Sequence, residues 1–430
     1  MLPVELLPTD EELRTLHEAQ KEFHRFPERS LQEVATAKRL RTKLENMECG
    51  PGITLEFVES ASTPGFACVM RNGEGPCVGY RADMDGLPVQ EDTGLPFASE
   101  NEGVMHACGH DSHMAVFLGA ARAFAAHPQL WSGTIVFIAQ AAEESAEGAH
   151  LMIKDGMWDR MPHPEVMYGA HVVPRPAGWV SLYPGGALPG SEGYEIIMRG
   201  RGGHGSQPHT AIDPVVLGAS VVMRLQTIVA RMTNPDKNAV VTVGKFVAGT
   251  ADNIIPDSAQ LLINTRFRDE ETGKIIGDGI ARIARAEAEA SGAPEPFIRC
   301  IRHVVATTNE PEATERLRRE LVEAAEKVFA NHANEDGQSG FSRGGGLPEC
   351  APLNIVKESF GFSEDFVYWG DAIGVPSVFW LYGGMGSEQV EKFGENPPAN
   401  HSPFFYADPE ASLEPALRVA LVAIHGRVGK

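Results

Sequence analysis

Residues 105–113 of this 430-residue chain read Met-His-Ala-Cys-Gly-His-Asp-Ser-His. They bring one thiol, three imidazoles and one carboxylate into a single short stretch beside a glycine. The segment His113–Ala126 that follows is rich in alanine and is expected to be a helix packed by Phe117 and Leu118. Thiolates, imidazoles and carboxylates are common ligands of divalent metals, so the stretch indicates a metal site at the start of a helix.

Short apolar runs on both sides of this stretch are typical of buried strands. Cys77–Arg81, Thr134–Gln140 and Val166–His171 fit this description, and they alternate with helical patterns such as Glu11–His24 and Ser30–Asn46. Strands that alternate with helices predict an α/β fold with a mixed, mostly parallel sheet covered by helices.

The pattern changes between residues 192 and 305, where an inserted second domain is expected. Its predicted elements follow the order strand, helix, strand, strand, helix, strand, at Tyr194–Arg199, Pro214–Ala230, Val240–Val247, Ala259–Arg268, Glu270–Ala290 and Phe297–Val304. That order predicts a ferredoxin-like α+β unit. Residues 1–191 and 306–430 then form a discontinuous first domain, which continues with a helix at 312–330, a loop rich in glycine and serine at 335–347, a strand at 377–382 and a closing helix at 409–427.

Composition limits the classes of partner. The chain is 43% hydrophobic and 22% charged, as expected of a globular protein, and its formal net charge is −21. An acidic surface repels phosphate backbones and anionic lipids, so neither nucleic acid nor a membrane is expected as a partner. The apolar runs are too short to span a bilayer and no secretory signal is recognised, so a cytoplasmic location is expected. The six cysteines are scattered, which favours core or functional thiols over a disulfide framework.

Acidic residues follow two of the predicted strands, where open α/β sheets place their sites. Asp83 and Asp85 come after the first strand, and Glu143 and Glu144 come after the second. The two aspartates suit either a turn or the support of a ligand histidine in one tautomer. Adjacent glutamates point in different directions, so one can bind a metal while the other acts as a general base. The alternative for the glutamates is a solvated turn.

Cys108 and His110 are separated only by Gly109. A thiolate held between two cations is deprotonated and offsets their mutual repulsion. The alternative for this pair is a buried thiol and a histidine at a helix N-terminus.

Two isolated histidines could complete a site for two metals. His171 ends a predicted strand, and His401 lies in a turn rich in proline. A lone histidine is more often structural than a metal ligand. These two are candidate ligands only because a dinuclear site needs neutral nitrogen ligands. His106 and His113 are left as supporting or structural residues.

A glycine-rich stretch at 200–205 superficially suggests a phosphate-binding loop. It lacks the Gly-Lys-Ser/Thr signature, and the next helix is expected only near Pro214. The stretch is therefore interpreted as a tight loop of the second domain that presents His204.

Six short motifs occur in order along nearly the whole chain. They are Arg81-Ala82-Asp83-Met84-Asp85-Gly86-Leu87-Pro88, His106-Ala107-Cys108-Gly109-His110-Asp111, Ala142-Glu143-Glu144, Gly169-Ala170-His171, Gly203-His204 and Asn400-His401-Ser402-Pro403-Phe404. This ordered set resembles the M20 metallopeptidase family. It is most similar to the amidohydrolase branch, which includes hippurate hydrolases, N-acyl-amino-acid hydrolases and plant auxin-conjugate hydrolases.

The resemblance implies a role for each residue of the set. The implied metal ligands are Cys108 as a bridge, His110, Glu144, His171 and His401. Glu143 is implied as the general base, and His204 as a histidine that polarises the scissile carbonyl and can reach a neighbouring subunit's site. Asn253 and Arg266 are implied as substrate contacts. Residues 192–305 are implied to be a lid or dimerisation domain, so a homodimer or higher homo-oligomer is expected.

The chemistry of Arg266 agrees with that role, because a guanidinium fork can bind both oxygens of a carboxylate. The alternative is a strand arginine in a surface ion pair.

The resemblance also implies the activity: two divalent ions per subunit help to cleave the amide bond of an N-acyl amino acid into a carboxylic acid and an amino acid. A thiolate with imidazoles suits zinc, and manganese, cobalt and nickel are alternatives. Peptidase branches carry a carboxylate where Cys108 stands, which favours small N-acyl amino acids over peptides. Two other hypotheses are a dipeptidase or aminopeptidase of the same family and a non-catalytic metal-dependent binding protein. A binding protein would not need the second carboxylate, Glu143.

Overall fold

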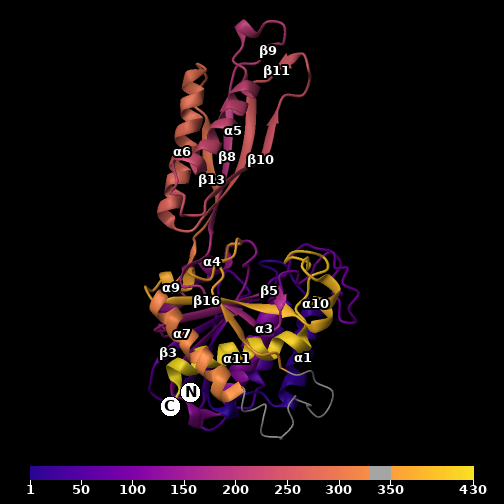
Figure 1. Cartoon of the computed structure of the whole chain (residues 1–430), viewed down its shortest axis with the longest axis vertical. Helices are drawn as coiled ribbons and strands as arrows, with labels where there is room; N and C mark the ends of the chain where they lie inside the picture. The colour runs from indigo at the N-terminus through magenta and orange to yellow at the C-terminus, as the bar shows by residue number, and fades with distance from the viewer. Residues whose placement is uncertain (330–349) are drawn as a thin grey trace. The chain divides into compact units, whose positions relative to one another are not determined.

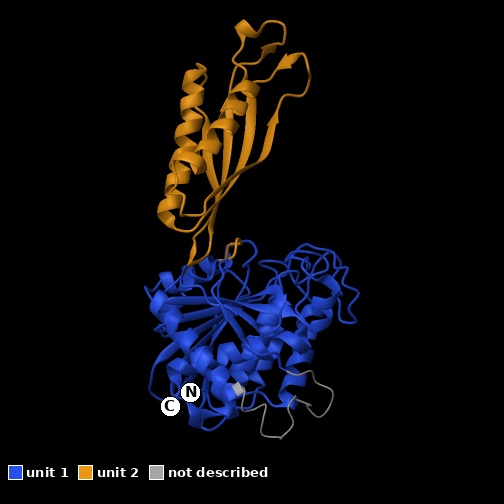
Figure 2. Cartoon of the chain, in the orientation of Figure 1, with its two compact units in different colours: residues 1–185, 309–359, 365–430 blue, residues 186–308, 360–364 orange. Residues whose placement is uncertain are grey.

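The computed structural model describes residues 1–329 and 350–430, and these form two compact units (Figure 2). Unit 1 comprises residues 1–185, 309–359 and 365–430, and unit 2 comprises residues 186–308 and 360–364. The second domain predicted at 192–305 thus falls within the main segment of unit 2. The glycine-rich loop predicted at 335–347 lies outside the described residues.

Unit 1 is built on an eight-stranded sheet with the order β1-β2-β4-β3-β5-β16-β6-β15 (Figure 1). The strands are β1 (Thr54–Glu59), β2 (Phe66–Asn72), β3 (Cys77–Asp83), β4 (Gly133–Gln140), β5 (Met167–Pro176), β6 (Trp179–Ser181), β15 (Asn354–Val356) and β16 (Ser377–Met385). The central strands β4, β3, β5 and β16 are parallel, whereas β1, β2 and β6 join the sheet through antiparallel pairs. The predicted mixed, mostly parallel sheet is therefore confirmed.

Helices bury both faces of this sheet. The helices of unit 1 are α1 (Asp10–Arg25), α2 (Val34–Glu45), α3 (His110–Ala126), α4 (Gly148–Lys154), α7 (Pro311–Ala324), α9 (Tyr368–Asp371), α10 (Ser387–Phe393) and α11 (Pro409–Val428). Helix α3 contacts α1, α11 and strands β3 and β5, and Tyr80 of β3 enters the apolar core that these elements share. Arg81, the next residue of β3, points to the opposite face. It is also buried there, so the strand is covered on both sides.

Helix α2 begins later than the predicted helix at Ser30. Leu31 has a positive φ of 64°, and the Ser30 hydroxyl donates to Asp85 Oδ2 over 2.7 Å. A left-handed residue cannot continue a right-handed helix, so the first residues of the predicted segment form a turn that contacts the strand end.

Unit 2 contains a four-stranded antiparallel sheet with the order β10-β12-β8-β13. Its elements are β8 (Gly190–Arg199), α5 (Pro214–Arg231), β10 (Val240–Ala248), β12 (Ser258–Phe267), α6 (Glu270–Ala290) and β13 (Phe297–Val304). Both the chain order and the strand order are those of a ferredoxin-like unit. The short pairs are β9 (Gly203–His204) with β11 (Ile254–Ile255) and β7 (Gly185–Leu188) with β14 (Thr307–Asn309).

The two helices of unit 2 cover one face of its sheet. Ile196 and Met198 of β8 share a buried cluster with residues of α5 and α6 such as Leu217 and Ile280. Alternate residues of β8 and β12 therefore lie on the face away from the helices. Among the described residues, only α5 is long and apolar enough to cross a membrane by length and composition, and Val221 and Leu225 at its centre are buried in this cluster.

Candidate metal centre

The predicted site residues of unit 1 gather where parallel strands end. Asp83 is the last residue of β3 and pairs with Gln140 at the end of β4, and the glutamates follow shortly after β4. His171 lies in the adjacent strand β5, and Cys108 lies two residues before the start of α3. The common direction of β3, β4 and β5 therefore brings segments that are far apart in sequence to one edge of the sheet.

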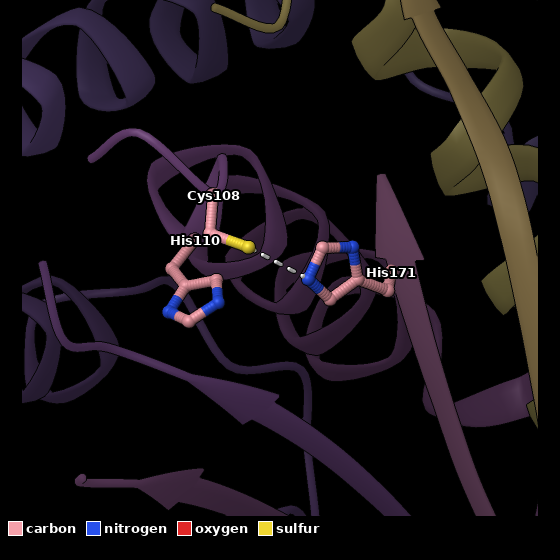
Figure 3. Close-up of side chains that lie close together, drawn as sticks. All are labelled: Cys108, His110 and His171. Carbon is pink, nitrogen blue, oxygen red and sulfur yellow. Dashed lines mark hydrogen bonds between the residues drawn. The ribbon is translucent and has the colours of Figure 1, made fainter. Parts of the chain in front are cut away.

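The Cys108 thiol lies between two imidazoles. Its Sγ atom is 3.3 Å from His171 Nε2 and 3.2 Å from His401 Nε2. Figure 3 shows the thiol directed at His171, with the His110 ring beside it. The Asn400 side chain donates to the carbonyls of Cys108 and Val172, each over 3.2 Å, and so ties the His401 loop to this segment.

The ligand atoms form two groups that share the thiol. The donor atoms of Cys108, His110 and His171 lie within 4.8 Å of one another, and so do those of Cys108, Glu144 and His401. His110 Nε2 and Glu144 Oε1 are buried and have no hydrogen-bond partner among the described residues. Unpaired buried polar atoms are costly, and cations bound at the two groups would satisfy both. The chemistry of these residues therefore fits two divalent cations, with the Cys108 thiol close to both groups.

Glu143 and Glu144 reach the site through a strained turn. Ala142 has a positive φ of 54°, and its backbone N–H donates to Glu33 Oε1 over 2.8 Å. The carboxylates lie close to one ligand, because His110 Nε2 is 3.8 Å from Glu143 Oε2 and 3.9 Å from Glu144 Oε1. Left-handed conformations of non-glycine residues concentrate at functional sites, and His401, with a φ of 71°, is another example here.

Asp85 contacts both His110 and the segment of Glu144. Its Oδ1 atom is 3.2 Å from His110 Nδ1, and its Oδ2 atom accepts the Glu144 backbone N–H over 3.0 Å. Burial opposes ionisation of this carboxyl, but hydrogen bonding and the charge of His110 lower its pKa overall. Asp83 lies 3.7 Å from the same ring nitrogen. Both aspartates therefore lie next to Nδ1 of His110, a position from which carboxylates commonly orient a ligand histidine.

His113, which the sequence predicts only as a supporting or structural residue, links the end of β3 to β5. Its Nδ1 atom is 2.5 Å from Asp83 Oδ1, and its Nε2 atom accepts the backbone N–H of Val172 over 2.9 Å. Its ring stacks on His110 at a centroid distance of 5.2 Å and meets His171 edge-on at 4.7 Å. Because Nε2 accepts a hydrogen bond, the proton of the neutral ring is on Nδ1 and faces Asp83. The sequence did carry a clue, since His110 and His113 are three residues apart in one helix and share a face.

A second network that the sequence did not indicate lies on the other side of Asp83. Arg81 is buried, and its guanidinium contacts Asp83 Oδ2 at 2.6 Å and Asp365 Oδ1 at 2.9 Å. Gln140 Oε1 accepts from Arg81 Nε over 2.8 Å and from Trp369 Nε1 over 2.7 Å. Nothing local marks Asp365, which meets Arg81 only through the tertiary fold.

The electrostatics of the cluster favour a cation. Burial, together with the charges of Glu144 and Glu143, raises the pKa of the Cys108 thiol. Burial also raises the pKa of Glu144 to about 7. Although burial opposes it, the charges of Asp83 and Asp85 raise the pKa of His110 to about 10. A metal ion among these groups would instead lower the pKa of the Cys108 thiol, because a coordinated thiol is deprotonated.

Three predicted site residues lie in unit 2 and are described within it. His204 pairs with Ile254 across β9 and β11, and its Nδ1 atom accepts the Ser206 backbone N–H over 3.2 Å. Asn253 is exposed and precedes β11, where its carbonyl accepts the Gly205 N–H over 2.8 Å. Arg266 lies near the end of β12 and is half-buried.

Known proteins share this sequence pattern and this fold. Residues 79–424 match the family described as Peptidase family M20/M25/M40. The N-acetyldiaminopimelate deacetylase of Leuconostoc mesenteroides is 40% identical over 59% of this chain, although the match spans only 64% of that protein. The hippurate hydrolase of Campylobacter jejuni is 38% identical over 68% of this chain and 75% of that protein.

A solved structure extends the likeness to both units. The Bacillus subtilis YXEP protein, described as a dinuclear metal binding peptidase from the M20 family, has a TM-score of 0.74 and 26% identity. The alignment covers 97% of this chain and 99% of that chain. Since the family match also extends over most of the sequence, the chain belongs to peptidase family M20/M25/M40.

Proposed function

We propose that the protein is a metal-dependent amidohydrolase that cleaves N-acyl amino acids into a carboxylic acid and an amino acid. The observation that carries this proposal is the pair of ligand groups that share Cys108, with Glu143 as an additional carboxylate beside them. The relatives named hippurate hydrolase and N-acetyldiaminopimelate deacetylase act, by those names, on acylated amino acids, which favours small acyl substrates over free peptides.

Five residues would hold two divalent cations. One cation would lie among Cys108, His110 and His171, and the other among Cys108, Glu144 and His401. Zinc suits a thiolate and imidazoles, and manganese, cobalt and nickel are alternatives. When bound, such ions polarise a carbonyl and lower the pKa of water.

The residues of the chain supply proton transfer and orientation. Glu143, which is 8% exposed, takes a proton from the attacking water and returns it to the leaving amine. Asp83 and Asp85 hold the His110 ring in the orientation that its ligand role needs. From unit 2, His204 polarises the scissile carbonyl, and Asn253 and Arg266 contact the substrate.

Unit 2 would then serve as the lid or dimerisation domain of a homodimer or higher homo-oligomer. This assignment, the absence of nucleic-acid and membrane partners, and the cytoplasmic location stay predictions.

A substrate panel on reconstituted enzyme tests the activity. Chelator-treated protein loaded with each of the four metals should release benzoate from hippurate and acetate from N-acetyl amino acids. An unblocked dipeptide should be cleaved much more slowly, because the proposal provides no partner for a free amine. Faster cleavage of the dipeptide would establish the peptidase alternative, and full metal binding without any turnover would establish the binding-protein alternative.

The base assignment is tested with Glu143→Gln. We expect this variant to keep its metal content and to lose about 10²–10⁴-fold in kcat, since general-base catalysis commonly contributes that much. Glu147→Gln is the matched control, because Glu147 is exposed in the same loop and should leave kcat unchanged. Glu143 is not the base if metal-loaded Glu143→Gln turns over like the control.

A further inference from the structure

The turn that carries Glu143 is held by two acidic side chains from other segments of unit 1. The Ala142 backbone N–H donates to Glu33 Oε1 over 2.8 Å, and the Glu144 backbone N–H donates to Asp85 Oδ2 over 3.0 Å. Glu143, the proposed general base, lies between these two donors in the sequence. Glu33 and Asp85 are both buried, and hydrogen bonds are electrostatically stronger in a buried environment than in water.

The conformation of the turn requires contacts of this kind. Ala142 has a φ of 54°, which is unfavourable for a residue with a Cβ atom. Its carbonyl accepts the Gly148 N–H over 3.0 Å within the same loop, whereas its N–H donates to Glu33 in a remote segment. The loop is closely packed, since a Cβ atom at Gly148 would lie 1.6 Å from the Ala141 carbonyl oxygen. A strained backbone persists only where its surroundings hold it, and Glu33 is one of the groups that do so here.

The segment that carries Glu33 is itself fixed to the end of β3. The Glu28 carbonyl accepts the Gly86 backbone N–H over 2.7 Å, and the Ser30 hydroxyl donates to Asp85 Oδ2 over 2.7 Å. Glu33 is the residue immediately before α2. Because β3 and β4 are paired neighbours, residues 28–33 connect the segments that follow both strands.

We propose that Glu33 is a positioning residue, whose carboxyl group fixes the backbone at Ala142 and thereby sets the direction of the Glu143 side chain. Misplacing a reacting group by about 1 Å can cost about 10²-fold in rate, so one buried hydrogen bond at this point affects catalysis. This inference rests on the proposed function, because Glu33 would support the role of Glu143 as the base. The sequence did not single out Glu33.

Kinetics of two Glu33 variants test this role. Glu33→Leu removes the acceptor with little change in volume, and it should lower kcat for hippurate about 10- to 100-fold while KM and metal content stay unchanged. Glu33→Gln keeps an oxygen that accepts the Ala142 N–H, so it should retain most of the wild-type kcat. Burial and the charge of Asp85 raise the pKa of Glu33 to about 7, and glutamine also imitates the protonated carboxyl. Gln32→Leu, at the exposed neighbouring position, is the control and should leave kcat unchanged.

A double-mutant cycle distinguishes positioning of the base from a general structural role. If Glu33 acts through Glu143, Glu33→Leu should change the residual kcat of Glu143→Gln by less than about twofold. A full additional loss in the double variant would overturn the inference, and so would a wild-type kcat in Glu33→Leu alone. Glu33→Asp, which withdraws the carboxylate by one methylene, allows the same comparison if the leucine variant does not fold.

Hydrogen exchange separates this inference from the proposed activity. In zinc-loaded protein, the Ala142 amide should exchange about tenfold faster in Glu33→Leu than in Gln32→Leu, because a buried hydrogen bond that protects it is lost. Equal exchange in the two variants would overturn the inference even if hippurate is hydrolysed. Faster exchange in Glu33→Leu would support the anchoring of the turn even if no metal-loaded form of the protein cleaves hippurate.

Discussion

His24 should make the stability of unit 1 depend on alkaline pH. Its side chain is 1% exposed, with Nδ1 3.2 Å from Asp111 Oδ2 and Nε2 3.2 Å from Glu91 Oε1. Burial alone would lower the pKa of this imidazole, but the two carboxylates outweigh it and raise the pKa to about 9. Asp111 follows the proposed ligand His110, so this buried ion triad includes a residue in the first turn of α3.

The size of the effect follows from the difference between the folded and unfolded pKa values. The imidazole has its ordinary pKa of 6.5 when unfolded and a pKa of about 9 when folded. Each unit corresponds to about 1.4 kcal/mol, so protonation contributes about 3 kcal/mol to the free energy of unfolding. Because the folded pKa is the higher one, this stabilisation is complete below about pH 6 and is lost as the pH rises through 9.

The assay is denaturant unfolding of the metal-free protein at pH 6.5 and pH 9.5, followed by tryptophan fluorescence. All five tryptophans lie in unit 1, so the signal reports that unit. Between these pH values, the free energy of unfolding of the wild type should fall by about 3 kcal/mol more than that of His24→Gln. His17→Gln is the control, because burial lowers the pKa of His17 to about 4 and its removal should not reduce the alkaline loss. Equal alkaline losses in the wild type and His24→Gln would refute the reasoning.

Three further predictions concern the metal centre. Gly109→Ala should cost about 2–5 kcal/mol of unfolding free energy, because Gly109 has a φ of 85° and the new Cβ would lie 2.3 Å from Val172 Cγ1. Gly94 also has a positive φ, 72°, but no atom lies within 4 Å of the new Cβ. Gly94→Ala should therefore lose only the free energy that a left-handed backbone costs an alanine, about 1–2 kcal/mol. Equal losses in the two variants would contradict the steric argument. His113→Asn should weaken metal binding about tenfold to hundredfold in a chelator competition, whereas His127→Asn, a change of a half-buried histidine at the other end of α3, should leave it unchanged. Unchanged affinity in His113→Asn would show that the ring does not position the ligands. Adding zinc to metal-free protein at about 1,000 times its dissociation constant should stabilise unit 1 by about 4 kcal/mol, an effect that would be absent if the cluster bound no metal.

The sequence alone indicated most of the architecture, because the spacing of apolar residues along the chain reflects whether a segment is a helix or a strand. Alternation and apolar runs identified the central strands β3, β4 and β5 and the ferredoxin-like order of unit 2. The same patterns missed β1 and β2, whose antiparallel pairing at the sheet edge is a non-local property. The predicted strand at 166–171 continues through Pro174 to Pro176, since neighbouring strands stabilise residues that local propensity would exclude.

For the site, residue chemistry and motif order identified the candidate ligands, but only the tertiary structure decided how they are grouped. Spacing along the chain cannot show that Cys108 belongs to both groups, because His171 and His401 reach it from segments that are remote in sequence. The contacts of His113 and the contact of Arg81 with Asp365 likewise depend on strand register and packing. A sequence records which side chains are present, whereas the distances and burial that determine their pKa values and partners arise only when the chain folds.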